Sequence, residues 1–80
     1  MPTFHVHITG IVQGVGFRPF VYKLAQQLQL TGWVCNDNDG VHIRFNAEEE
    51  KANNFCQTII HNPPQNAVIH KYSLTKSDDE

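Results

Sequence analysis

Two close glycines and one arginine could together bind a phosphate group. They lie in the segment Gly10-Ile-Val-Gln-Gly-Val-Gly-Phe-Arg18-Pro19, which joins a strand-like run to a helix-like run. Glycines let a loop turn its amides inward, and successive inward N–H groups form a concave anion site. The start of the following helix adds unpaired amides and the positive end of its dipole. The guanidinium of Arg18 adds a planar fork of donors that matches phosphate oxygens.

Two better-known glycine loops do not fit this segment. A dinucleotide-binding fingerprint needs a third glycine, and Pro19 stands where that glycine belongs after Gly14 and Gly16. A Walker loop needs Gly-Lys-Ser/Thr before its helix, and the chain has no such sequence. The alternative is that the glycines only build a tight connection. The presence of Arg18 at the helix start favours a phosphate site.

Asn36 is the second candidate for chemistry. Its amide offers a donor and an acceptor without charge, so it could hold a water molecule near a phosphate without electrostatic repulsion. The alternative is a turn residue, because Asn36 begins the run Asn-Asp-Asn-Asp-Gly.

Three histidines raise the question of a metal site. His5 and His7 point to the same side of a predicted strand, and His42 from another strand could be a third ligand. Exposed strand histidines are common, and no carboxylate or cysteine joins them at ligand spacing. We therefore expect no metal and no cofactor. Cys35 and Cys56 form no CxxC motif and are expected to be buried thiols.

Composition limits the class of protein. The 80 residues are 40% hydrophobic and 18% charged, which is typical of one soluble domain over residues 1–80. No apolar run approaches the ~18 residues of a membrane helix, and the N-terminus lacks a secretion signal. A cytoplasmic protein is expected. The net charge of −2 with six Lys and Arg residues indicates a small ligand and no nucleic acid.

Periodicity predicts the elements that position these residues. Phe4, Val6 and Ile8 alternate with polar residues, as in a strand with one buried face. From Phe17 the spacing becomes helical, with Pro19 expected at the first helical position and Arg18 at the N-cap. The apolar helix stripe comprises Phe17, Phe20, Val21, Leu24, Ala25 and Leu28. Gly32 is expected just past the helix end.

The rest of the chain predicts a hairpin, a second helix and a last strand. Residues 33–36 and 41–45 read as paired strands around the turn 37–40. Asn46 is expected to cap the second helix, which Pro63 and Pro64 end. Residues 67–75 alternate poorly and predict a strand with a bulge or at an edge. Residues 76–80 are polar and are expected to form a mobile tail.

The element order β-α-β-β-α-β indicates an α+β, ferredoxin-like sandwich, in which an antiparallel sheet carries both helices on one face. RNA-recognition domains share this order, but they need stacking aromatics on the open sheet face. Here that face would carry the polar residues His5, His7, His42 and Arg44. RNA binding is therefore the least favoured interpretation.

Three segments together are similar to the acylphosphatase family. They are Val12-Gln-Gly-Val-Gly-Phe-Arg18, Gly32-Trp-Val-Cys-Asn36 and Asp39-Gly-Val41. Within the family, Gly16-Phe-Arg-Pro-Phe-Val21 and Val34-Cys-Asn-Asp37 most resemble the N-terminal domain of the HypF carbamoyltransferases of nickel–iron hydrogenase maturation. The resemblance covers about residues 4–75. Family members usually continue into one more short strand, so a shortened or excised unit is expected.

The resemblance implies hydrolysis of acyl phosphates to a carboxylate and inorganic phosphate, without a metal or a covalent intermediate. Arg18 would bind the phosphoryl group, and Asn36 would orient the attacking water. The loop amides implied to bind phosphate are those of Gln13, Gly14, Val15, Gly16 and Phe17. In the HypF context the substrate would be carbamoyl phosphate, and further domains of a larger maturation enzyme would be partners. A non-catalytic phosphate-binding or docking module is the alternative.

Overall fold

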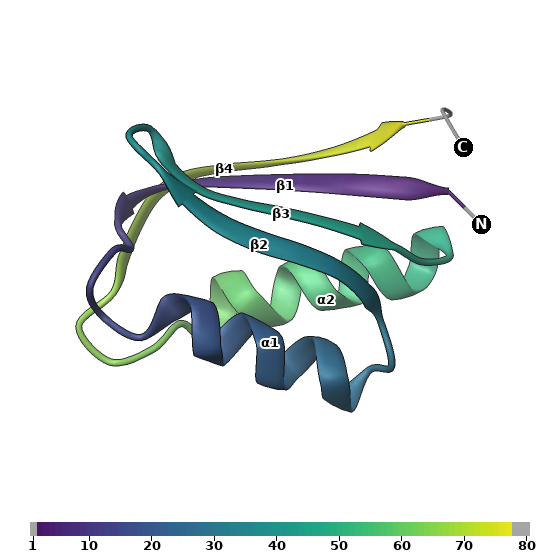
Figure 1. The fold of residues 1–80 in the computed structure, drawn as a ribbon, viewed down its shortest axis with the longest axis horizontal. Helices are drawn as coiled ribbons and strands as arrows, with labels where there is room; N and C mark the ends of the chain where they lie inside the picture. Colours follow the sequence, from purple (N-terminus) through teal and green to yellow (C-terminus); the bar gives the residue numbers. More distant parts are fainter. Residues whose placement is uncertain (1, 78–80) are drawn as a thin grey trace.

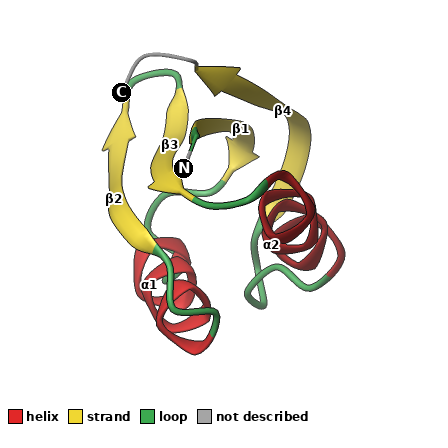
Figure 2. Ribbon diagram, turned by 90° about the vertical axis from the view of Figure 1, so that its right-hand side faces the viewer, coloured by secondary structure: helices red, strands yellow, loops and turns green. Residues whose placement is uncertain are grey.

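The protein is a four-stranded antiparallel sheet covered on one face by two helices (Figure 1 and Figure 2). A computed structural model describes residues 2–77, without the side chains of Cys35 and Asn36. The elements are β1 (Thr3–Ile11), α1 (Phe17–Gln27), β2 (Thr31–Asp37), β3 (Gly40–Asn46), α2 (Glu49–His61) and β4 (Val68–Ser77). The strand order β2-β3-β1-β4 confirms the predicted ferredoxin-like sandwich. No helix within the described residues is long and apolar enough to cross a membrane.

The central strand β1 places its apolar side chains in the core. Phe4, Val6 and Ile8 are buried, and they lie opposite the buried residues Phe45, Ile43 and Val41 of β3. The helices close this layer with Phe17, Val21, Phe55 and Ile59. The odd-numbered residues of β1 therefore face away from the helices.

Helix α1 begins earlier than the sequence predicts. Its N-cap is Gly16, so Arg18 occupies the second helical position and Pro19 the third. The prediction of Arg18 as N-cap was wrong because Gly16 takes a left-handed conformation, with φ 78° and ψ 23°, and turns the chain into the helix at Phe17. Pro19 is tolerated there because the first four amides of a helix have no intrahelical acceptor.

The end of α1 also differs from the expectation. The Leu30 amide donates to the Ala25 carbonyl and the Gln29 amide donates to the Gln26 carbonyl, which is the Schellman arrangement. Gln29 takes the left-handed position with φ 58°. Gly32 is consequently not a helix-ending residue but lies inside β2.

Two further boundaries were predicted wrongly. Asn46 is the last residue of β3, and its Oδ1 accepts a hydrogen bond of 2.8 Å from Thr3 Oγ1, whereas Glu48 is the N-cap of α2. Lys76 and Ser77, expected in the tail, extend β4 by pairing with β1, while residues 78–80 lie outside the described residues. The predicted bulge and edge are both confirmed, because β4 is an edge strand whose register shifts opposite Thr9 and Gly10.

Gly32 is required by the close approach of β2 to β3. A Cβ atom at this position would overlap the Arg44 carbonyl oxygen and lie 2.7 Å from the Phe45 Cα. Because both neighbours are backbone, they cannot move without disturbing the β2–β3 pairing.

We expect Gly32→Ala to lower the free energy of unfolding by about 2 kcal/mol or more. Urea denaturation checks this, with Thr31→Ala as a matched control in the same strand. Thr31 is exposed, so its truncation should change the free energy of unfolding by less than about 0.5 kcal/mol. Equal urea midpoints for the two variants would contradict the close-approach explanation.

Candidate functional site

The loop between β1 and α1 is anchored at both ends and has a left-handed backbone at two glycines between them. Val12 and Phe17 are buried, at 1% and 2% exposure, and fix the two ends in the core. Gly14 and Gly16 have φ angles of 74° and 78°, a conformation that costs other L-residues about 1–2 kcal/mol. Nothing in the described chain lies within 4 Å of a Cβ placed at either glycine. Glycine is therefore favoured at both positions because the backbone is left-handed there, and not because a side chain would lack space.

The start of α1 presents positive charge, and no acidic residue stands in its first turn. The helix also has no side-chain cap. Its first turn is closed by a hydrogen bond of 3.2 Å from the Phe20 amide to the Gly16 carbonyl. Arg18 is exposed and forms no ion pair within residues 2–77. The helix dipole and one guanidinium are thus both available to an anion.

One contact brings this loop to the end of β2. Gln13 Nε2 donates a hydrogen bond to the carbonyl oxygen of Asp37, which is 24 residues further along the chain. Asp37 directly follows Asn36, whose backbone lies opposite Val41 in the β2–β3 register. Figure 1 shows the β1–α1 loop and the β2–β3 turn at the same end of the molecule. The backbones of the two predicted segments therefore approach each other, and the side-chain role of Asn36 stays a prediction.

Two cavities of the described residues lie near this loop or beside α1. An apolar cavity of about 300 Å³ lies between α1 and β2, and it is lined by residues such as Tyr22, Trp33 and Phe55. A shallower cavity of about 570 Å³ lies between the end of β1 and the β2–β3 turn, and Gln13 is the one member of the predicted phosphate-binding set that lines it. The first cavity offers no cationic group except Arg44. A phosphate site at the loop would therefore depend mainly on its donors and charge.

Known proteins share this arrangement over the length of the domain. The sequence profile of the acylphosphatase family matches residues 4–80. The chain belongs to the acylphosphatase family. It is 41% identical over 70 residues to the acylphosphatase of Pseudothermotoga lettingae, covering 86% of this chain and 79% of that protein. The crystal structure of acylphosphatase from Bacillus subtilis superposes with a TM-score of 0.90 at 33% identity, covering 100% of this chain and 89% of that chain.

The acylphosphatase domain is also similar to part of a larger enzyme. It is 36% identical over 74 residues to the carbamoyltransferase HypF of Synechocystis sp., covering 92% of this chain. It spans 10% of that protein, and a tenth or less of the other carbamoyltransferases of this kind that it matches. The resemblance predicted from the paired motifs is thus confirmed, and so is the prediction of an enzyme of the acylphosphatase family.

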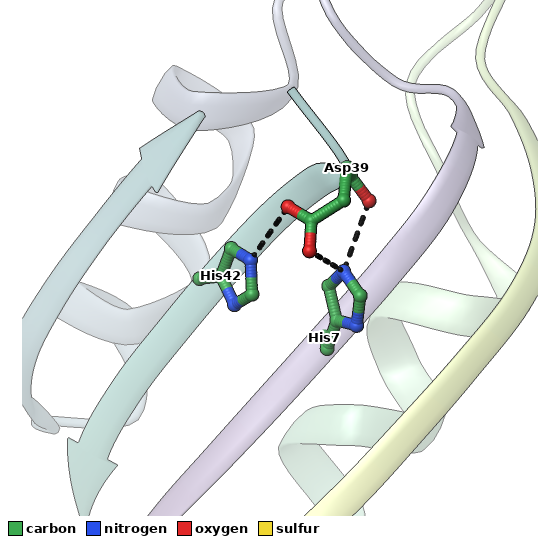
Figure 3. A group of neighbouring side chains, drawn as sticks. All are labelled: His7, Asp39 and His42. Atoms are coloured by element: carbon green, nitrogen blue, oxygen red, sulfur yellow. Dashed lines mark hydrogen bonds and ion pairs between the residues drawn. The ribbon is translucent and has the colours of Figure 1, made fainter. Parts of the chain in front are cut away.

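Sequence reasoning missed one group of side chains. Asp39 in the β2–β3 turn lies against two histidines of the open sheet face (Figure 3). Its Oδ1 is 3.0 Å from His42 Nε2, and its Oδ2 is 3.5 Å from His7 Nε2. The expectation that no carboxylate joins the histidines was wrong, because the hairpin turn brings Asp39 beside β1. The available signal was the spacing of Asp39 three residues before His42 at a predicted hairpin.

The side chains of this histidine–aspartate group shift one another's pKa values. Partial burial lowers the pKa of His5, and the neighbouring His42 and Arg44 lower that pKa further. A hydrogen bond from His42 is the main reason that the pKa of the Asp39 carboxyl is below its usual value. Asp39 therefore stays an anion beside the imidazoles at neutral pH.

We expect Gly16→Ala to disturb the loop measurably. Because alanine is disfavoured at the left-handed φ of Gly16, the substitution should lower the free energy of unfolding by about 1 kcal/mol. Relaxation of that strain should turn the loop amides away and weaken binding of inorganic phosphate at least about fivefold. Amide chemical shifts of residues 13–18 during a phosphate titration provide the measurement, with Gln26→Ala on the exposed surface of α1 as the control. Parent-like phosphate affinity in Gly16→Ala would contradict a cradle built by this turn.

Proposed function

We propose that this domain hydrolyses acyl phosphates to a carboxylate and inorganic phosphate, by in-line attack of water and without a metal ion or covalent intermediate. One observation carries the proposal. The β1–α1 loop has two left-handed glycines and leads into a helix whose first turn holds Arg18 and no acidic residue. Membership of the acylphosphatase family supports the reaction class.

The chemistry of the substrate suits such a sparse site. The leaving group is a carboxylate, which needs little protonation to depart, so the main demand is stabilisation of charge on the phosphoryl oxygens. In the proposal, Arg18 binds that group through its planar fork. The amides of residues 13–17 and the dipole of α1, equivalent to about half a positive charge, complete the phosphate-binding set.

The attacking water must be held in the correct position, and this matters more for the reaction than a strong base does. An in-line displacement gains most of its rate from placement of the nucleophile. We assign this placement to Asn36, whose amide can accept from and donate to water without repelling a phosphate. The hydrogen bond between Gln13 and Asp37 supports the assignment, because it joins the loop to the residue after Asn36.

The natural substrate proposed is carbamoyl phosphate, with inorganic phosphate as a product. Similarity to carbamoyltransferase HypF supports this choice. The further partners proposed are other domains of a larger hydrogenase-maturation enzyme, in the cytoplasm. A non-catalytic phosphate-binding or docking module is a second candidate, because the chain spans only 10% of the HypF of Synechocystis sp..

We expect Arg18→Ala to lower kcat/KM for benzoyl phosphate by roughly 150-fold, equivalent to about 3 kcal/mol. Arg18→Lys should recover part of this loss, because it restores the charge but not the fork. Arg44→Ala is the matched control, since Arg44 is exposed in β3 and outside the loop. Phosphate release is the measurement. Turnover that survives Arg18→Ala in a folded protein would refute the assignment.

Asn36→Ala should lower kcat for benzoyl and carbamoyl phosphate by at least tenfold and leave KM nearly unchanged, because the amide is assigned to the water and not to the phosphate. A chelator should not alter the parent rate. A parent protein that binds phosphate but releases none from either compound would favour the docking module instead.

A further inference from the structure

We propose that His7, Asp39 and His42 form a binding site for one divalent transition-metal ion, with Zn²⁺ as the best match. Each residue offers one ligand atom, and these atoms lie within 4.8 Å of one another. The site uses none of the residues assigned to the proposed hydrolysis, so metal binding can be measured independently of turnover.

The ligand atoms lie close enough together to be drawn around one tetrahedral ion. Bonds of about 2.0–2.2 Å to zinc place neighbouring ligands roughly 3.3–3.6 Å apart. His42 Nε2 lies 3.0 Å from Asp39 Oδ1, and His7 Nε2 lies 3.5 Å from Asp39 Oδ2, so each imidazole is beside a different oxygen of the same carboxylate. The rings of His7 and His42 are parallel, with centroids 4.3 Å apart and planes at 7°. Figure 3 shows both Nε2 atoms directed at the Asp39 carboxylate. Because the lone pairs of two stacked rings run parallel, the His7 and His42 side chains must rotate so that both lone pairs converge on one ion.

The backbone holds these ligands in place before any ion binds. His7 and His42 are direct partners in the antiparallel β1–β3 register, so their Cα positions are set by the sheet. Asp39 belongs to the turn that precedes β3, and its carbonyl oxygen accepts a hydrogen bond of 2.9 Å from His7 Nε2. When an ion binds, His7 takes the tautomer with its proton on Nδ1, the Nε2 proton is lost to solvent, and the Nε2 lone pair bonds to the ion in place of this hydrogen bond.

His5 acts on the site as a positioning residue. Its Nε2 lies 2.9 Å from His42 Nδ1, and the two rings are stacked with centroids 5.1 Å apart. In the metal-free site His42 Nε2 carries the proton that it donates to Asp39. Metal binding requires the other neutral tautomer, in which the Nε2 proton is lost to solvent, Nδ1 carries a proton and donates it in a hydrogen bond to His5 Nε2, and the Nε2 lone pair faces the ion. Ligating histidines are usually oriented by a second hydrogen bond of this kind.

The chemistry of the donors selects the class of ion. Imidazole nitrogens suit zinc and its neighbours, whereas Mg²⁺ and Ca²⁺ prefer oxygen ligands throughout. Solvent can deliver the ion, because the side chains of His7, His42 and Asp39 are 30%, 19% and 60% exposed. Three protein ligands leave the fourth position of a tetrahedron for water.

Titration of the full chain with Zn²⁺, in competition with a chromophoric chelator, tests the proposal. We expect one equivalent per chain. His7→Gln, Asp39→Asn and His42→Gln should each weaken binding at least tenfold, while His70→Gln on the exposed face of β4 should leave the affinity unchanged. No saturable binding in the micromolar range, competition by Mg²⁺ at equal concentration, or an equal loss in His70→Gln would overturn the proposal.

Two further measurements separate a metal site from a structural cluster. His5→Ala should weaken Zn²⁺ binding about tenfold at unchanged stoichiometry, and His5→Gln, which keeps an acceptor, should restore most of the affinity. Co²⁺ bound to the parent should give the visible bands of a four-coordinate ion without the near-ultraviolet band of a thiolate ligand. That measurement needs no variant, so it decides the case even if a substitution prevents folding. A thiolate band would overturn the ligand assignment.

Discussion

The alternation of side chains along β1 is the constraint on which the rest of the structure depends. This strand pairs with both β3 and β4. The side chains of every second residue therefore point toward the helices, and the others point to the open face of the sheet. A slip of one residue would expose Phe4, Val6 and Ile8 and bury the histidines. The same register places His7 opposite His42 and directs the chain from the end of β1 into the loop that precedes Arg18. Packing and chemistry therefore depend on a single register.

The β2–β3 turn connects the two regions of chemical interest. The carbonyl of Asp37 accepts from Gln13 of the loop, and the carboxylate of Asp39 faces two histidines of the sheet. The turn is consequently held from both sides. A turn held in this way can keep nearby groups in position at low cost in conformational entropy, because much of that entropy is lost on folding.

The local arrangement of charged and polar groups, and not the net charge, decides which ions this small domain could bind. The chain has a formal net charge of −2, yet the start of α1 presents a guanidinium and unpaired amides, with no acidic residue in the first turn of the helix. On the open face the pattern is reversed, with a carboxylate among imidazoles. The proposed anion and cation sites therefore depend on local groups more than on net charge, because salt at physiological strength screens exposed charges beyond about 8 Å.

By itself the sequence determined the element order, the buried faces and the hairpin, because periods of two and 3.6 residues are local properties of strands and helices. It also identified the loop with Arg18, because glycines mark backbone that other residues avoid. It failed at the ends of α1, where Gln29 took a left-handed position expected of glycine and Gly32 proved to be needed for strand contact. Only the tertiary structure decided that Gln13 reaches Asp37 and that Asp39 joins His7, over 24 and 32 residues. The physical reason is that such meetings follow from strand register and turn direction, which the whole packed sheet sets and no local pattern encodes.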